Sequence, residues 1–330
     1  MVRDEIRKIG GRSSPHFHSS ISIQKLMAGL AVALSPALGF GIYQYGLSAV
    51  LLIGVCVVAS VLTEFALDVL VHRKTTKIFN LHSLVVGLMM AAMLPPGCSL
   101  PVAVIGAVVA ILLGKAPFGS LGGSFIAPTI LGMMVLFVSW PNAVTQWRFP
   151  DQSVQYNKEY VAETPIEAVH ADPSDEYDYS PLKMFTGAGK VGTIGASSGL
   201  ALTLGAFLLF FLRITRMYAT LGYLVGIATA ALIIGKIYPE EPTVWFHLTT
   251  GYALFAAMFL VNDIPASPVA ERGMLLYGVL AGALTIVLRW AGVGFGAALF
   301  AVAFTSLLVP FFDRLAVKSS FRNEVNHEGK

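Results

Sequence analysis

Charged residues are scarce in this chain. Of its 330 residues only 12% are Asp, Glu, Lys or Arg and 55% are hydrophobic, and the mean hydropathy is +0.71. Soluble domains carry about 25% charged residues. This shortage, together with several long apolar runs, excludes an ordinary soluble domain and predicts a protein embedded in a lipid bilayer. The net charge of +3 is too small and too dispersed to predict a nucleic-acid partner.

Cysteine is nearly absent as well. The two cysteines, Cys56 and Cys98, have no second Cys or His at ligand spacing. The sequence therefore predicts no metal ligands, and neither a zinc site nor an iron–sulfur centre held by this chain alone. It also lacks the Gly-rich fingerprint that follows a strand in nicotinamide-binding folds. Any such chemistry is expected on partner proteins.

Long apolar runs dominate what is present. A helical span needs about 20 mostly apolar residues, and this criterion, applied with some shorter runs, gives about ten spans. We place them near 25–44, 47–67, 81–96, 100–115, 125–140, 192–212, 217–236, 245–261, 273–289 and 294–312. The fold class predicted is an all-α integral membrane protein with one large external loop. The short runs predict helices that stop inside the membrane.

The distribution of basic residues predicts the orientation. Arg3, Arg7 and Lys8 precede the first run, which has no typical signal-peptide cleavage site and is expected to be retained. The polar segment 141–190 has four Lys/Arg against eight Asp/Glu, which suits an external loop. The division expected is 1–24, cytoplasmic; 25–140, first membrane repeat; 141–190, external loop; 191–313, second membrane repeat; 314–330, cytoplasmic tail.

An internal repeat supports this division. His82 and His247 each open a short span and lie 165 residues apart, and Ala91-Ala92-Met93 recurs at the same offset as Ala256-Ala257-Met258. Because an odd number of spans, about five, falls on either side, the two repeats are expected to be inverted across the membrane. The alternative is that both histidines are only interfacial residues at helix starts.

Three segments could carry chemistry. The loop "GKAPFGSLGGSFIAPTI" (114–130) is rich in Gly and allows close approach to a ligand or to another helix. In "LVNDIPASPVAERG" (260–273), Asp263 stands at the edge of a span, where a carboxylate marks either a functional site or an exposed helix end. Glu64 and Asp68 share one helical face and either serve an ion path or balance the basic loop that follows.

These segments resemble, in order and spacing, a known family. "HSLVVGLMMAAMLPP", "GKAPFGSLGGSFIAPT", "HLTTGYALFAAMFLVNDIPASPV" and "LLVPFFD" are similar to the D-type membrane component of the Rnf electron-transport complex and to its relative, the B-type component of the Na+-translocating NADH:quinone reductase. The resemblance covers about residues 25–315. It implies a flavin-binding membrane subunit with inverted repeats, in a complex that couples electron transfer to Na+ or H+ movement.

The resemblance also implies a flavin site. The family attaches FMN through a phosphoester to a threonine just before the sixth span, and alignment on Pro181-Leu182 places Ser180 at that position. Tyr179 replaces the small neighbour of the acceptor, and Thr186 offers a second hydroxyl. These departures disfavour covalent attachment, and FMN or riboflavin held non-covalently is the alternative. Further flavin contacts implied by the resemblance are Lys115, Phe118, Gly119, Gly122, Asp263, Ser267 and Pro268.

The function predicted is that of a non-standalone electron-transfer subunit in the prokaryotic cytoplasmic (inner) membrane, with both termini cytoplasmic. Its expected partners are the lipid bilayer and the other membrane and soluble subunits of an Rnf-like complex, including iron–sulfur and flavin subunits. Two alternatives stay open: a transporter or channel that has lost its flavin, and a purely structural membrane subunit on the same scaffold.

Overall fold

The computed structural model describes residues 23–70, 81–118, 123–148, 163–171, 180–187, 190–238 and 242–316, and these residues are almost entirely helical. The first half contains α2 (Ile23–Tyr45), α3 (Leu47–Leu70), α4 (Leu81–Met93), α5 (Leu100–Gly114), η1 (Ala116–Phe118) and α6 (Pro128–Ser139). The polar segment contributes α7 (Pro141–Val144), α8 (Pro165–Ala171) and α9 (Pro181–Thr186). The second half contains α10 (Gly199–Phe211), α11 (Met217–Ile237), α12 (Val244–Thr249), α13 (Ala253–Phe255), η2 (Ala256–Leu260), η3 (Ile264–Ala266), α14 (Glu271–Trp290), η4 (Gly294–Gly296) and α15 (Ala297–Ser306).

Five of the described helical segments are long and apolar enough to cross a membrane: Ile23–Tyr45, Leu47–Leu70, Leu100–Phe118, Met217–Ile237 and Glu271–Trp290. A sixth is possible if Gly294–Ser306 and Val309–Ala316, which meet at 56°, count as one broken span. The helices α4, α6 and α10 are apolar but shorter. The all-helical membrane class is therefore confirmed, while the structure by itself gives five or six full spans in the described residues.

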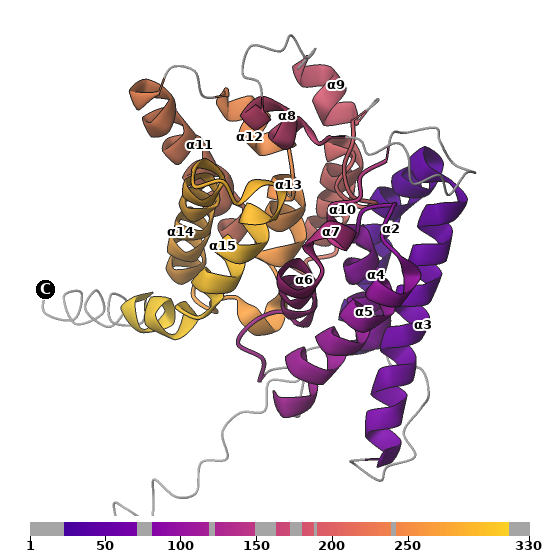
Figure 1. Ribbon diagram of the computed structural model, residues 1–330. Coiled ribbons are helices and arrows are strands. Elements are labelled where there is room, and N and C mark those ends of the chain that lie inside the picture. Colours follow the sequence, from indigo (N-terminus) through magenta and orange to yellow (C-terminus); the bar gives the residue numbers. More distant parts are fainter. Residues whose placement is uncertain are drawn as a thin grey trace, which may run out of the picture.

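The helices form two groups that meet along two seams. In the first group α3, α4 and α5 pack together and α6 packs on α5; in the second, α11 packs on α14, and α14 on α15 (Figure 1). The groups contact each other where α2 packs on α10 and where α6 packs on α15. The first helices of the two groups therefore pair with each other, and so do the last.

The α11–α14 pair is the closest helix contact, and glycine makes it possible. A Cβ atom at Gly226 would overlap the carbonyl oxygen of Val279, and one at Gly282 would overlap that of Tyr223. Gly222 and Gly278 face the partner backbone in the same way. Small residues at four-residue spacing let membrane helices approach until their backbones touch, where van der Waals packing is strongest.

The segment before α10 closes the end of α4. The backbone N–H of Gly195 donates to the carbonyl of Ala92 at 2.8 Å, and that of Ile194 donates to Leu94 at 3.1 Å. The Tyr252 hydroxyl donates to the carbonyl of Met93. Because α4 ends in the buried core, these donors from the second half satisfy carbonyls that would otherwise have no partner.

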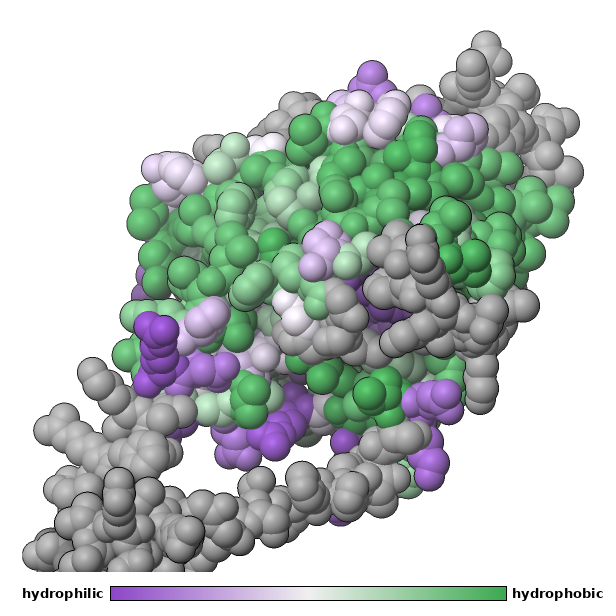
Figure 2. Space-filling view, turned by 90° about the horizontal axis from the view of Figure 1, so that it is seen from below, coloured by the Kyte–Doolittle hydropathy of each residue, from purple (hydrophilic) through white to green (hydrophobic). Residues whose placement is uncertain are grey.

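Hydrophobic side chains cover most of the outer surface seen in Figure 2, and hydrophilic residues gather toward its margins. Exposed positions on the apolar helices carry residues such as Leu62 on α3, Leu204 on α10 and Ile233 on α11. This is the surface of a helix bundle that faces lipid instead of water.

The structure agrees with most of the predicted runs and adds one break. Predicted runs 25–44, 47–67, 100–115, 217–236 and 273–289 correspond to full-length helices. The run 245–261 is instead divided into α12, α13 and the π-helical turn η2, with Gly251 between α12 and α13 at a φ of +59°. Both members of the repeated histidine pair are buried, each 7% exposed.

The glycine contact predicts a pair of opposite effects on one helix. We expect Gly226→Ala to lower the free energy of unfolding by about 1–3 kcal/mol, because the new methyl group overlaps the α14 backbone. Gly235→Ala, on the same helix but with no atom within 4 Å of the added Cβ, is the matched control. It should be neutral or stabilising by up to about 1 kcal/mol through helix propensity. Thermal unfolding in detergent measures both; equal effects would contradict the packing described.

Candidate functional site

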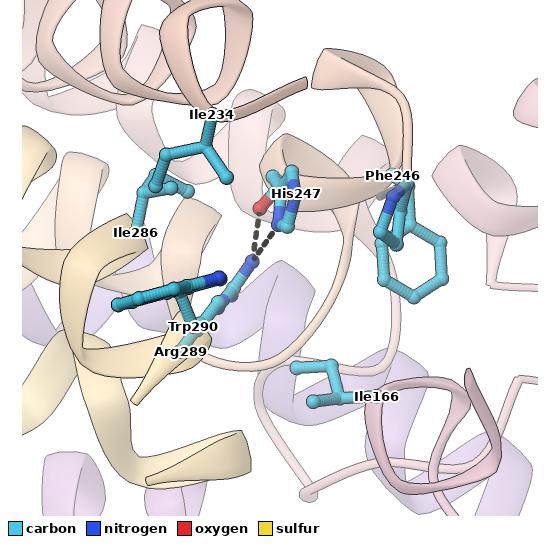
Figure 3. A pocket seen from close by; sticks show the side chains of 8 residues that line it. Ile166, Ile234, Phe246, His247, Ile286, Arg289 and Trp290 are labelled. Atoms are coloured by element: carbon cyan, nitrogen blue, oxygen red, sulfur yellow. Dashed lines mark hydrogen bonds between the residues drawn. The ribbon is translucent and has the colours of Figure 1, made fainter. Parts of the chain in front are cut away.

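The buried side chain of Arg289 bonds to the backbone at the helix break between α12 and α13. Arg289, on α14 and only 2% exposed, donates from Nη1 to the carbonyl of His247 at 2.7 Å (Figure 3). Its Nη2 donates to the carbonyl of Thr250, also at 2.7 Å. A third contact joins Nη1 to the Thr250 hydroxyl at 3.4 Å. The carbonyl of His247 lacks a helical donor because α12 stops at Thr249, whereas that of Thr250 also accepts a long bond from the Ala253 backbone N–H at 3.4 Å. The guanidinium therefore replaces the missing backbone hydrogen bonds.

A second buried basic side chain, that of Lys190, bonds to the backbone at the same helix break. Lys190 donates from its ammonium to the carbonyl of Thr249, and its own carbonyl accepts from Gln44 Nε2 on α2 at 2.8 Å. Lys190 precedes α10 and lies outside the helical spans. Burial lowers the pKa of its ammonium to about 7, and the Arg289 charge acts in the same direction. Among the described residues, neither cation has a carboxylate within ion-pair distance.

A small pocket, here called the outer pocket, lies beside this break. It is lined by His247 and Arg289 and by apolar residues that include Ile234, Ile286 and Trp290 (Figure 3). Ile166 of α8 lines it from the polar segment. The helix α8 is fixed in turn by Glu167, which accepts from Trp147 Nε1 at 3.1 Å and from the Thr164 backbone N–H at 3.0 Å. Part of the predicted external loop is thus ordered and buried against the second half.

A second pocket, here called the inner pocket, lies between the two halves. Its polar lining comes from His82 on α4, Thr129 on α6 and Asp263, and apolar residues such as Met27 and Met89 complete it. The oxygen Oδ2 of Asp263 is buried and accepts no hydrogen bond from the described residues. The pocket has room for ordered water but not for a flavin ring.

An ion pair lies in the first half, at the same end as the inner pocket. Lys115, at the C-terminal end of α5, binds Glu64 of α3, and both side chains are largely buried at 17% and 8% exposure. His82 interacts electrostatically with Lys115. Phe118 follows in η1 and packs edge-on against Phe125, with ring centres 5.7 Å apart.

The predicted attachment residues lie on α9, at the other end of the molecule (Figure 1). Ser180 is the N-cap residue of α9, and Thr186 ends the helix, where its hydroxyl donates to the carbonyl of Leu182 at 2.9 Å. Phe185 lies 6.1 Å from the ring of Trp245, whose Nε1 donates to the carbonyl of Pro181. The helix α9 is thereby docked on α12, close to Lys190.

The predicted site residues therefore fall at three places. Lys115 and Phe118 lie at the α5 end, and Asp263, Ser267 and Pro268 lie around η3, near the inner pocket. Ser180 and Thr186 lie on α9, far from both (Figure 1). Gly119 and Gly122 lie outside the described residues.

Three functional candidates escaped prediction. The Glu64–Lys115 ion pair was not predicted, because the two residues are 51 positions apart and Glu64 was matched with Asp68 on its own helix. Arg289 falls within the apolar run 273–289, and an intramembrane arginine is a functional signal that the sequence offered. Lys190 stood in a polar segment, where nothing indicated burial.

The fold and these sites define a class. A chain with several lipid-length apolar helices, broken and short helices satisfied internally, and buried ionisable groups is a multi-pass membrane protein.

Comparison with known proteins gives the family. Residues 11–322 match the model of the NQR2, RnfD, RnfE family, and the chain belongs to that family. It is 32% identical over 281 residues, 85% of each chain, to the D component of the Na(+)-translocating ferredoxin:NAD(+) oxidoreductase complex of Acetobacterium woodii. It is 28% identical to the D component of the proton-translocating ferredoxin:NAD(+) oxidoreductase complex of Clostridium ljungdahlii, covering 94% of this chain and 95% of that one. The D component of the ion-translocating oxidoreductase complex of Mannheimia succiniciproducens is 26% identical, covering 92% of this chain and 94% of that one.

The ion pair predicts a strongly non-additive double-mutant cycle. Lys115→Met or Glu64→Gln alone leaves a buried group without its partner and should cost about 3–5 kcal/mol of stability. The double variant should cost less than the sum, with a coupling of about 0.5–3 kcal/mol. Unfolding of the purified chain in detergent measures the four free energies. Additive effects would show that the pair is not formed in solution.

Proposed function

We propose that this chain is a membrane subunit of an Rnf-like complex in the prokaryotic inner membrane, where it couples electron transfer to Na+ or H+ translocation. The observation that carries this proposal is the family match across nearly the whole chain, joined to relatives whose names state ion translocation. One of those relatives is named for Na+ and another for protons, so both ions stay in the proposal.

The scaffold we propose is a pair of inverted five-helix repeats with about ten membrane-entering helices. The order of elements supports it, because α2 to α6 and α10 to α15 each give a first helix, a long helix, a short or broken element, a long helix and a last helix. The pairing of α2 with α10 and of α6 with α15 is what a two-fold relation between the repeats would produce. In this arrangement both termini face the cytoplasm.

The α9 end is the place where the residues best fit a flavin. Thr186 offers a hydroxyl at the end of a helix, and the Phe185–Trp245 pair offers aromatic faces beside it. Ser180, also on α9, is the second candidate for covalent attachment. A bound flavin would supply one- and two-electron transfer. The positive charges of Lys190 and Arg289 would favour an anionic ring nearby.

The inner pocket fits a flavin less well. Its lining residues leave space for water only, so a ring there would have to lie against its mouth. Lys115, Phe118, Asp263, Ser267 and Pro268 are proposed as contacts for a non-covalent flavin at a junction with a neighbouring subunit. Such neighbours would include iron–sulfur and flavin subunits, because no group of metal-binding side chains occurs in the described part of this chain.

Peptide mass spectrometry of the denatured chain, with a parallel assay for released flavin, tests the cofactor. Because the departures from the family's acceptor motif disfavour covalent attachment, we expect released flavin and no adduct. An FMN adduct within 150–190 that is lost in Thr186→Val and retained in Thr203→Val, whose hydroxyl is likewise helix-bonded but lies on α10, would instead establish attachment at Thr186. Loss in Ser180→Ala instead would move the attachment point. Stoichiometric released flavin without an adduct would support the non-covalent site, and an intact complex with no flavin on this chain would overturn the flavin-binding role.

A further inference from the structure

A row of buried polar side chains winds along α14. Tyr277, Thr285 and Arg289 follow one another at intervals of eight and four residues, so that they lie within an arc of about 120° of the helix, and all are at most 2% exposed. From Tyr277 to Arg289 the helix rises about 18 Å, more than half of the hydrocarbon thickness of a bilayer.

Hydroxyl groups from neighbouring helices join this row. The Tyr223 hydroxyl of α11 lies 2.8 Å from Thr285 Oγ1, and the Tyr277 hydroxyl lies 3.2 Å from Ser306 Oγ of α15. Thr285 and Ser306 also donate to carbonyls of their own helices. Each hydroxyl can both donate and accept, so rotation of the O–H bonds can reverse the direction of the hydrogen bonds.

The row connects the two pockets. Near the N-terminal end of α14, Asp263 lines the inner pocket and interacts electrostatically with Tyr277. At the C-terminal end, Arg289 lines the outer pocket and interacts electrostatically with Tyr223. Each pocket thus contributes a buried polar atom without a partner among the described residues, Asp263 Oδ2 at one end and Arg289 Nε at the other.

We propose that Asp263, Tyr277, Ser306, Tyr223 and Thr285 form a proton-transfer path through the second half of the protein, closed at its outer end by Arg289. This inference rests on the proposed role in ion translocation. The path suits a proton and not a metal ion, because no group of metal-binding side chains occurs in the described residues. The transfer requires water molecules between the hydroxyl pairs, since no hydrogen bond between described residues joins one pair to the other.

The transfer conserves atoms and involves no electrons. A proton from the inner side binds the Asp263 carboxylate; as the Asp263 O–H bond breaks, the proton passes through water to a hydroxyl oxygen, which releases its own proton onward. Each hydroxyl returns to its starting state, Asp263 becomes a carboxylate again, and one proton leaves to water at the outer pocket.

The positive charge of Arg289 controls whether a proton can leave the path at its outer end. An unpaired guanidinium raises the free energy of any cation beside it, so a proton is opposed at the outer end. A negative charge brought to the α9–α12 region by electron transfer would lower that barrier. Proton passage would then follow electron arrival, which is the coupling that a redox-driven pump needs.

Proton and Na+ uptake into vesicles containing the whole reconstituted complex tests the path. With ferredoxin-dependent NAD+ reduction and flavin content measured in parallel, we expect Tyr223→Phe and Thr285→Val to abolish proton uptake. Thr285→Ser, which keeps the hydroxyl, should retain it. Thr305→Val is the matched control, because Thr305 is equally buried but bonds only its own helix.

The gate has a separate signature. Arg289→Gln should let protons leak without any electron donor, and adding Tyr223→Phe to it should stop the leak. Wild-type uptake of protons in Tyr223→Phe and Thr285→Val, or a leak that survives the double change, would overturn the path. Wild-type vesicles that reduce NAD+ without moving any ion would instead overturn the proposed function itself. Assembly failure of Thr285→Val leaves Tyr223→Phe and Thr285→Ser to decide, since the proposal requires opposite results from them.

Discussion

Helices that end inside an apolar interior leave carbonyl groups without donors, and this constraint organises the molecule. Each unsatisfied group costs several kcal/mol in a membrane, so the donors must come from elsewhere in the chain. At the end of α4 they come from Ile194, Gly195 and Tyr252. At the break after α12 they come from Arg289 and Lys190.

At both helix ends the hydrogen-bond network includes residues of both halves. The end of α4 in the first half is closed by residues of the second, and Lys190 is itself held by Gln44 of α2. Neither half can therefore satisfy its interior alone, and the two must fold as one unit. The glycine contact of α11 and α14 then fixes α14, and with it the position of Arg289 under the break.

In the part of the chain that the structure describes, buried basic side chains are paired with a carboxylate at the α5 end of the protein but not at the α12 break. Lys115 is neutralised by Glu64, whereas Arg289 and Lys190 are held by carbonyl dipoles without a carboxylate among the described residues. Carbonyls satisfy the hydrogen bonds of a cation but do not cancel its charge. The end beside α9 and α12 is therefore left electropositive, which suits the anionic flavin proposed there.

The sequence was enough for the elements that depend on local pattern. Uninterrupted apolar length predicted α2, α3, α5, α11 and α14, because the cost of exposing backbone to lipid leaves helix as the only choice. Of the repeated histidines, His82 lines one pocket and His247 the other. Contacts between distant helices could not be predicted in this way. Glu64 and Lys115 are 51 residues apart, and the break at Gly251 became visible only with the cations that support it.

The inverted arrangement proposed above requires the α9 helix and the loop after η3 to face opposite sides of the membrane. Both native cysteines are buried, so single cysteines introduced at exposed positions can be labelled against a low background. Leu182 is 71% exposed on α9, and Val269 is 75% exposed beside α14. With a membrane-impermeant thiol reagent on intact cells, Leu182→Cys should be labelled at once and Val269→Cys only after permeabilisation. Labelling of both positions from the same side would contradict the inverted arrangement and the path that depends on it.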